Sequence, residues 1–168
     1  WGRDAFTTLA LLADRTKKAN LATGIVNYYS RTPAALAQHF ATLDELSGGR
    51  MIIGLGASSA NVIEHFHGVP FQPTLTRMRE TVEIINHLIA AEPLNYNGDI
   101  FKLERGFTLR FDPVRTHIPV YIASFRPRAV KLVAEIADGW MPRMMPIDRL
   151  PGQVDAFRAQ VVAAGRDA

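Results

Sequence analysis

Apolar residues recur along most of this chain at spacings of three and four, the period of a helix with one buried face. This period predicts helices over residues 5–18, 33–47, 76–91 and 127–137, with a last helix around Val154, Phe157 and Val161. Short apolar runs between them predict strands over residues 21–26, 51–55, 119–123 and 140–141. Because strands and helices alternate, we expect an α/β fold with parallel strands and right-handed crossovers.

One helix and the strand after it are the most clearly marked elements. Thr32 is placed to cap a helix that has Pro33 in its first turn, and the two glycines at 48–49 can take the positive φ that ends it. The run at 51–53 then predicts a strand covered on both faces. The apolar residues of the helix are expected to form one buried face: Leu36, Phe40, Leu43 and Leu46.

The strand over 51–55 runs into the sequence Gly54-Leu55-Gly56-Ala57-Ser58-Ser59. Glycines let backbone amides approach a ligand closely, and serine hydroxyls add donors, so we expect phosphate or ribityl oxygens to bind here. The spacing imitates a dinucleotide fingerprint, but the third glycine is missing. No acidic residue follows ~20 positions later, where residues 74–76 stand, so a Rossmann dehydrogenase is not expected.

The residues from Tyr96 to Ile100 predict a turn between two extended segments, and hence a hairpin insertion over about 94–111. The rest of residues 1–168 reads as one domain. It fits either a doubly wound sheet or a (β/α)8 barrel. A barrel needs eight strands and typically ~250 residues, so that reading requires the chain to be a fragment.

The composition of the chain limits the kinds of ligand, partner and cellular location that we expect. The chain has 168 residues, 48% of them hydrophobic and 21% charged, as in an ordinary folded domain. Its net charge of +3 comes from dispersed Lys and Arg, which favours an anionic ligand weakly and gives no reason to expect nucleic acid. It has no cysteine, which excludes disulfides and thiolate sites. No apolar run approaches the ~20 residues of a membrane span, and no signal pattern is present, so we expect no membrane partner and a cytoplasmic location.

Two groups of polar residues are expected to have no ligand. The histidines in residues 65–67 could suggest a metal, but only Glu64 is near and no coordination set is complete, so we expect no metal and a loop near the substrate mouth. Arg31 and Arg50 are expected to be structural and to tie helix ends to neighbouring carboxylates such as Asp44 or Glu45.

Four motifs follow one another in the order of a known family. They are Ala22-Thr23-Gly24-Ile25-Val26-Asn27, the turn from Tyr28 to Pro33, the segment from Leu43 to Gly56, and Ile118 to Ser124 followed by Pro127 and by Ala137-Asp138-Gly139-Trp140. Together they resemble the luciferase-like monooxygenase superfamily, most closely its coenzyme F420-dependent oxidoreductases, including the methylene-tetrahydromethanopterin reductases. The resemblance covers nearly the whole chain.

This resemblance implies a partial (β/α)8 barrel with about four central βα units, a fragment of a full barrel. The chain starts at Trp1 without methionine, which also suggests a missing beginning. Half a barrel would leave open strand edges, so we expect the isolated chain to be marginal, and the full-length protein to be a homo-oligomer. In such a barrel the carboxyl ends of all strands face the same opening, and residues 141–143 should be among the residues there.

The resemblance also implies where a cofactor would bind. It implies a cis peptide between Gly24 and Ile25 that backs the cofactor ring, with Asn27 and the loop 54–58 holding its polar edge and tail. The loop 123–127 is expected to bind phosphate, because it opens a helix and Arg126, which stands where the family usually has glycine, adds a charge. The predicted cofactor-binding residues are Gly24, Ile25, Asn27, Gly54, Gly56, Ala57, Ser58, Ala123, Ser124 and Arg126.

The expected function is F420-dependent hydride transfer to or from a small organic substrate. Two alternatives stay open: an FMN-dependent monooxygenase, and a flavin-binding protein without catalysis. No catalytic residue is identified. Ser59 stands where the family's sugar-phosphate dehydrogenases have a glutamate, and the acid and base residues that the first two strands usually supply are not in this chain.

Overall fold

Strand β3 lies at the centre of the molecule, with parallel partners on both sides. The computed structural model describes residues 2–142 and 145–168. In these residues the sheet is open, in the order β1-β3-β6-β7, with β2 pairing β3 beyond the end of β1. Its strands are β1 (Leu21–Ala22), β2 (Val26–Asn27), β3 (Met51–Gly56), β6 (Val120–Ala123) and β7 (Gly139–Met141). The predicted α/β fold with parallel pairing is confirmed.

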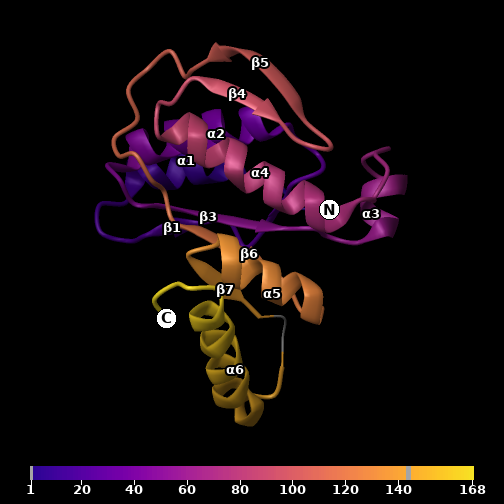
Figure 1. Cartoon of the computed structure of the whole chain (residues 1–168). Helices are drawn as coiled ribbons and strands as arrows, with labels where there is room; N and C mark the ends of the chain where they lie inside the picture. The colour runs from indigo at the N-terminus through magenta and orange to yellow at the C-terminus, as the bar shows by residue number, and fades with distance from the viewer. Residues whose placement is uncertain (1, 143–144) are drawn as a thin grey trace.

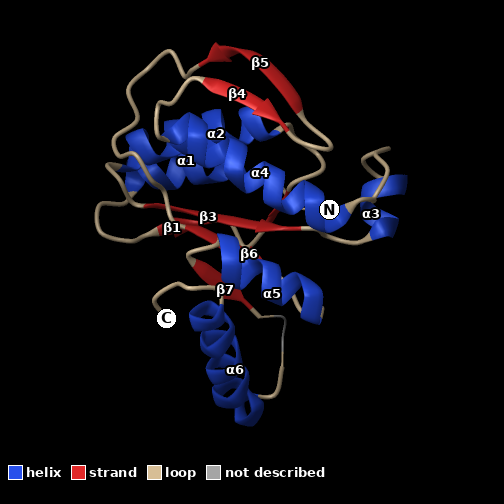
Figure 2. Ribbon diagram, viewed as in Figure 1, coloured by secondary structure: helices blue, strands red, loops and turns tan. Residues whose placement is uncertain are grey.

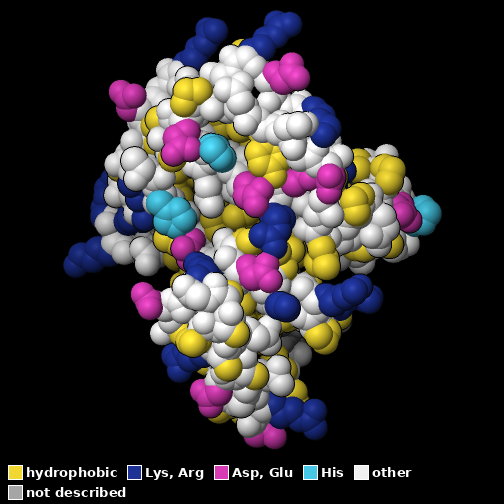
Figure 3. Space-filling model, viewed as in Figure 1, with side chains coloured by type: hydrophobic (Ala, Val, Ile, Leu, Met, Phe, Trp, Pro, Cys, Tyr) yellow, Lys and Arg dark blue, Asp and Glu magenta, His cyan; other side chains and the backbone are white. Residues whose placement is uncertain are grey.

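The helices pack on one another in chain order. Figures 1 and 2 show α1, α2 and α4 together on one side of β3, with α5 and α6 beside β6 and β7. Figure 3 shows acidic and basic side chains interspersed where α4 meets α5, and Arg79 and Glu135 form an ion pair of 2.5 Å between these helices. The helices are α1 (Ala5–Arg15), α2 (Pro33–Ser47), α3 (Ala60–His65), α4 (Thr74–Ile89), α5 (Pro127–Ile136), the 3-10 turn η1 (Ile147–Arg149) and α6 (Leu150–Ala163). None of these helices is both long and apolar enough to span a bilayer.

Local signals set the ends of α2 as expected. The Thr32 hydroxyl accepts a hydrogen bond from the backbone N–H of Ala35 at 3.2 Å, and Pro33 is the first helical residue. Gly48 and Gly49 have φ of +67° and +81°, so the helix ends in the left-handed conformation that glycine permits.

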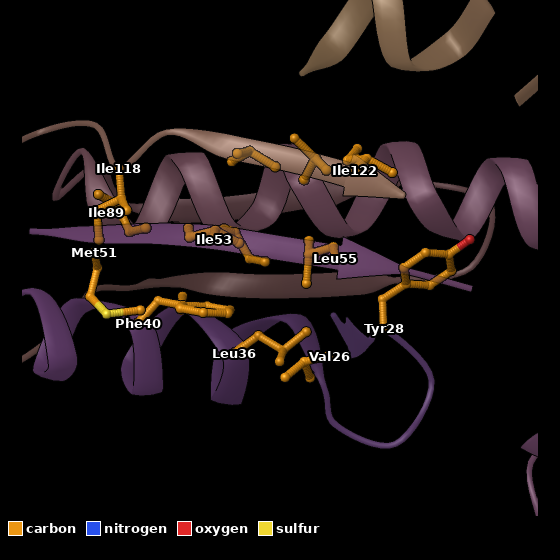
Figure 4. Packing of buried hydrophobic residues seen from close by; sticks show 14 of the residues in the cluster. Val26, Tyr28, Leu36, Phe40, Met51, Ile53, Leu55, Ile89, Ile118 and Ile122 are labelled. Carbon is orange, nitrogen blue, oxygen red and sulfur yellow. The ribbon is translucent and has the colours of Figure 1, made fainter. Parts of the chain in front are cut away.

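The buried face of α2 differs from the predicted one at its last turn. Figure 4 shows Leu36 and Phe40 pointing from α2 toward β3, and both are fully buried. Leu46, in contrast, is 55% exposed. The buried stripe continues through Asp44 and Ser47, which make polar contacts with the start of β3, and this turns Leu46 to solvent.

The single strand expected over 21–26 is wrong, because the chain breaks into β1 and β2. The peptide between Gly24 and Ile25 at this break is cis, as the resemblance implied. Thr23 bridges the break: its hydroxyl donates to the carbonyl of Gly54 at 2.6 Å and accepts from the N–H of Gly54 at 3.0 Å. A Cβ on Gly54 would lie 1.7 Å from the Thr23 carbonyl oxygen, so only glycine fits there.

Helices cover one face of β3 and β6, and β3 itself is buried along its length except at the half-buried Ile52. The side chains of Ile53 and Ile122 are fully buried on the helix side. On the other face Ile52 is half-buried and Tyr121 is 36% exposed. The Tyr121 ring lies across Gly139, where a Cβ would be 2.7 Å from it.

The amino ends of the strands carry a buried polar network. Asp44 accepts hydrogen bonds from the N–H of Met51 at 3.0 Å and from both Nε and Nη2 of Arg115 at 2.9 Å. Arg50 donates instead to carbonyl oxygens, including those of Ala13 and Thr16. The expected pairing of Arg50 with residues 44–45 is therefore wrong, because Arg115 already occupies the Asp44 carboxylate.

Arg31 pairs with a carboxylate at a helix end, as expected, although the partner is Asp4, the N-cap of α1, at 2.5 Å and not Asp44 or Glu45. Two segments differ from the prediction. Residues 60–65 form α3 where a loop was expected, and α1 ends at Arg15, before the expected Lys18. Helix α1 ends there because the backbone of Thr16 is extended, although its N–H still donates to the carbonyl of Leu12.

An antiparallel hairpin lies where the turn signal was found. It consists of β4 (Leu94–Asn97) and β5 (Lys102–Phe107), and its second strand ends before Phe111. Figure 2 shows it on the far side of α4 from the sheet. The buried carboxylate of Glu80 on α4 accepts from the backbone N–H groups of residues 99–101, which fixes the hairpin turn to this helix.

Candidate functional site

The carboxyl ends of the strands meet at one edge of the sheet. The parallel register places Asn27 beside Gly56, Gly56 beside Ala123, and Ala123 beside Met141. A cavity of about 1170 Å³ opens at this edge. Its lining consists of residues 24–25, 56–60, 71–72, 74–75, 78, 123–129 and 141–142. This is the edge at which parallel α/β proteins bind ligands.

The floor of the cavity is made of small side chains. Gly56 and Ala123 are neighbours in the register, with Ile25 packed against one side and Met141 beside the other. A Cβ on Gly56 would lie 2.9 Å from the Cγ1 atom of Ile25. Glycine at this position therefore leaves room for the Ile25 side chain against the end of β3, and this makes the floor of the cavity apolar.

One side of the cavity is basic. Helix α5 begins here at Pro127, and its first-turn amides have no acceptor within the helix. The exposed side chains of Arg126 and Arg128 flank this helix start, and they are the only ionisable side chains among the described residues that line the cavity. The helix dipole and two guanidinium groups together favour an anion on this side.

Hydroxyl groups from two loops stand beside the basic side. Ser58 and Ser59 follow β3, and Ser124 follows β6. Ser58 has a left-handed φ of +64°, which is uncommon for a residue with a Cβ and is found more often at binding loops than elsewhere. In the described part of the chain these hydroxyls make no hydrogen bond, so their donors are available to a ligand.

Another part of the lining is apolar, and sequence reasoning missed it. Phe71, Leu75 and Met78 form it. The sequence predicts a helix over residues 76–91 but no ligand contact from its first turns. The signal was available, because a helix that follows a parallel strand starts at the carboxyl edge of the sheet, so its first two turns border any site there.

Eight of the ten predicted cofactor-binding residues line the cavity, and two do not. Gly54 is packed against Thr23 in the middle of the sheet. Asn27 holds the turn after β2: its Oδ1 accepts from the N–H of Ser30 at 2.8 Å, and its Nδ2 lies 3.4 Å from Nε2 of His67. Of the strand-end residues expected at the mouth, Arg143 lies outside the described residues.

No group of three or more His, Asp or Glu side chains in residues 2–142 and 145–168 is arranged to hold a metal ion. The lining described above also contains no carboxylate and no histidine. As far as the described residues form it, this cavity can bind a ligand through arginines, hydroxyls and backbone amides and through apolar contacts.

Comparison with known proteins identifies the family. The family model described as luciferase-like monooxygenase matches residues 1–168. A curated relative, the 5,10-methylenetetrahydromethanopterin reductase of Archaeoglobus fulgidus, is 38% identical over 137 residues, which are 82% of this chain and 40% of that protein. The chain spans about half the length of the curated relatives it matches.

Solved structures agree with this similarity. The coenzyme F420-dependent tetrahydromethanopterin reductase from Methanopyrus kandleri superposes with a TM-score of 0.87 at 28% identity, over 99% of this chain and 52% of that one. A monooxygenase from Streptomyces bottropensis superposes with a TM-score of 0.84 at 26% identity, over 98% of this chain and 51% of that one. The resemblance found in the four motifs is confirmed, and the chain belongs to the luciferase-like monooxygenase family.

Proposed function

We propose that the protein is a coenzyme F420-dependent oxidoreductase that transfers a hydride to or from a small organic substrate. The observation that carries the proposal is the cavity at the carboxyl edge, whose lining combines a basic, hydroxyl-rich part with an apolar part. Such a division suits a cofactor with an anionic tail and an apolar, planar ring. Two of the similar proteins, the Methanopyrus reductase and a secondary alcohol dehydrogenase, are F420-dependent by name.

The residues present fit this coenzyme. Arg126, Arg128 and the amides at the start of α5 would hold its phosphate, and the hydroxyls of Ser58 and Ser124 would bind polar atoms next to it. Gly56 and Ala123 leave room for a ring against Ile25. When bound, the coenzyme supplies the hydride chemistry. The chain contributes binding and orientation, and its apolar wall excludes water from the same space.

The architecture of the whole protein belongs to the same proposal. We propose that the open sheet is part of a (β/α)8 barrel, because its helices form a layer on one face and Tyr121 stands on the other, partly exposed. In such a barrel the residues that donate or accept protons would come from strands other than those described. A homo-oligomeric state, a cytoplasmic location, and the absence of nucleic acid and membrane partners remain predictions.

An absorbance titration with each cofactor tests the proposal. The protein, expressed at its natural full length, is titrated with F420 and separately with FMN. We expect F420 to bind at micromolar concentration and FMN to bind much more weakly. Tight FMN binding without F420 binding would instead support the monooxygenase, which the family name and the Streptomyces structure make the second candidate. Reduction of the bound cofactor without turnover of any substrate in a panel of hydride donors would support a non-catalytic flavin-binding protein.

A further inference from the structure

Three aromatic rings form a stack directly behind the apolar side of the cavity. The rings of Tyr28 and Tyr29 lie 5.2 Å apart at an angle of 28°, and those of Tyr29 and Phe71 lie 5.3 Å apart at 24°. Tyr28 and Tyr29 come directly after β2, three and four residues beyond the cavity-floor residue Ile25, and Phe71 lines the cavity. The stack therefore connects the floor of the cavity with its apolar side.

Hydrogen bonds lock the middle ring to the apolar side. The Tyr29 hydroxyl donates to the backbone carbonyl of Phe71 and lies 3.1 Å from the hydroxyl of Thr74. The Thr74 hydroxyl donates to the same carbonyl at 3.0 Å. Burial raises the pKa of Tyr29, so its hydroxyl keeps the proton that this contact needs. Both residues that it reaches are at the entrance to α4, and both line the cavity.

A cationic side chain also contacts the middle ring of the stack. The Arg77 guanidinium lies 5.0 Å from the centre of the Tyr29 ring and 5.3 Å from that of Phe101 in the hairpin. A guanidinium between two aromatic faces is attracted to both. Tyr29 is therefore held on three sides, by Tyr28, Phe71 and Arg77, and its side chain has little freedom to move away from the cavity.

We propose that Tyr29 is a positioning residue that fixes the apolar wall, defined as residues 71–78, at the distance from the cavity floor that bound cofactor requires. The part concerning the cofactor rests on the proposed function. The part concerning the wall rests on the contacts of Tyr29 alone. Removing the hydroxyl deletes the bonds to Phe71 and Thr74 while leaving the ring stack in place, so the wall loosens without loss of the core.

The chain offers a matched control one residue away. Tyr28 is 1% exposed and stacks on the same ring, but its hydroxyl has no hydrogen-bond partner among the described residues. Tyr28→Phe and Tyr29→Phe thus remove the same atom from neighbouring, similarly buried tyrosines. Only the second removes a contact with the wall.

The test uses the full-length protein and two measurements. Without cofactor, amide hydrogen exchange of residues 71–78 is followed in the wild type and both variants, and we expect about tenfold faster exchange in Tyr29→Phe with no change in Tyr28→Phe. With F420, we expect Tyr29→Phe to raise the Kd several-fold and to change the absorption and fluorescence anisotropy of the cofactor at saturation. A purely structural loss would lower the bound fraction and leave the signature of bound cofactor unchanged.

Two results would overturn the inference. One is equal exchange of residues 71–78 in the two variants. The other is faster exchange in Tyr29→Phe with unchanged spectra of bound F420 at saturation, whether or not the Kd rises, which would mean that the wall does not position the cofactor. If the wild type binds neither F420 nor FMN, the proposed function fails, and the exchange rates alone decide whether Tyr29 holds the wall.

Discussion

The polar side chains at the two ends of the sheet differ in whether they have partners within the described part of the chain. At the amino end, Asp44 and Arg115 are joined by two hydrogen bonds, and Arg50 donates to several carbonyls. At the carboxyl end, Ser58 and Arg128 make no hydrogen bond or ion pair within the described part of the chain. The amino end therefore stabilises the fold, while the carboxyl end keeps its donors free for a ligand, which is the division of labour expected of parallel α/β sheets.

The largest effect should come from a glycine that looks like part of the ligand loop but packs in the sheet. Gly54→Ala places a Cβ 1.7 Å from the Thr23 carbonyl oxygen, so β1, β2 and β3 cannot keep their spacing. We expect a loss of about 3 kcal/mol or more in the free energy of unfolding, measured by urea denaturation. Gly152→Ala, where a Cβ meets nothing within 4 Å, is the control. An unchanged urea midpoint for Gly54→Ala would place Gly54 on the ligand side of the comparison.

The next effect belongs to the amino end. Asp44→Asn removes the charge that Arg115 faces, although one oxygen can still accept from Met51. Because the Arg115 side chain is 32% exposed and can be hydrated, we expect about 2 kcal/mol of destabilisation, less than for a fully buried pair. Asp14→Asn on the exposed side of α1 should cost almost nothing. F420 affinity of the folded Asp44→Asn variant should equal that of the wild type, and a weaker Kd would mean that the two ends are coupled.

A substitution at the carboxyl end should weaken cofactor binding and leave stability unchanged. Arg126→Gln removes a charge from the basic side of the cavity but no hydrogen bond within the described chain. We expect the Kd for F420 to rise about tenfold, or ~1.4 kcal/mol, with an unchanged urea midpoint. Arg3→Gln, an exposed arginine outside the cavity lining, controls for net charge. Equal Kd values for the two variants would show that the anion lies elsewhere.

The smallest effect is at the start of α1, where a cap combines with a surface ion pair. The backbone N–H of Thr7 and the nearby Arg31 hold the pKa of Asp4 below its usual 3.8. Its contribution is therefore present above that pH and is lost as the pH falls through the lower folded value. Asp4→Asn keeps a cap and should change stability at pH 7 by less than ~0.5 kcal/mol. The thermal midpoint of the variant should fall less between pH 4 and pH 2 than that of the wild type, and identical falls would contradict the assignment.

Much of the site could be located from the sequence because strand ends are encoded locally. Gly56, Ser58, Ser124 and Arg126 could be found because each lies at the end of an apolar strand or in the loop after it, and parallel topology brings such positions to one edge. Gly54 belongs to the same motif but packs against Thr23, 31 residues earlier. No pattern within a few residues separates a glycine that admits a ligand from one that admits a neighbouring strand.

The sequence by itself determined the alternation of the longer helices with parallel strands, the cap at Thr32 and the glycine end of α2, because each depends on neighbours within one or two turns. Only the tertiary structure decided which partners the buried charges take, as in Asp44 with Arg115, and which residues form the apolar wall with Tyr29 behind it. Those contacts join segments about 40 to 70 residues apart, and their geometry exists only once the sheet and its helices have packed.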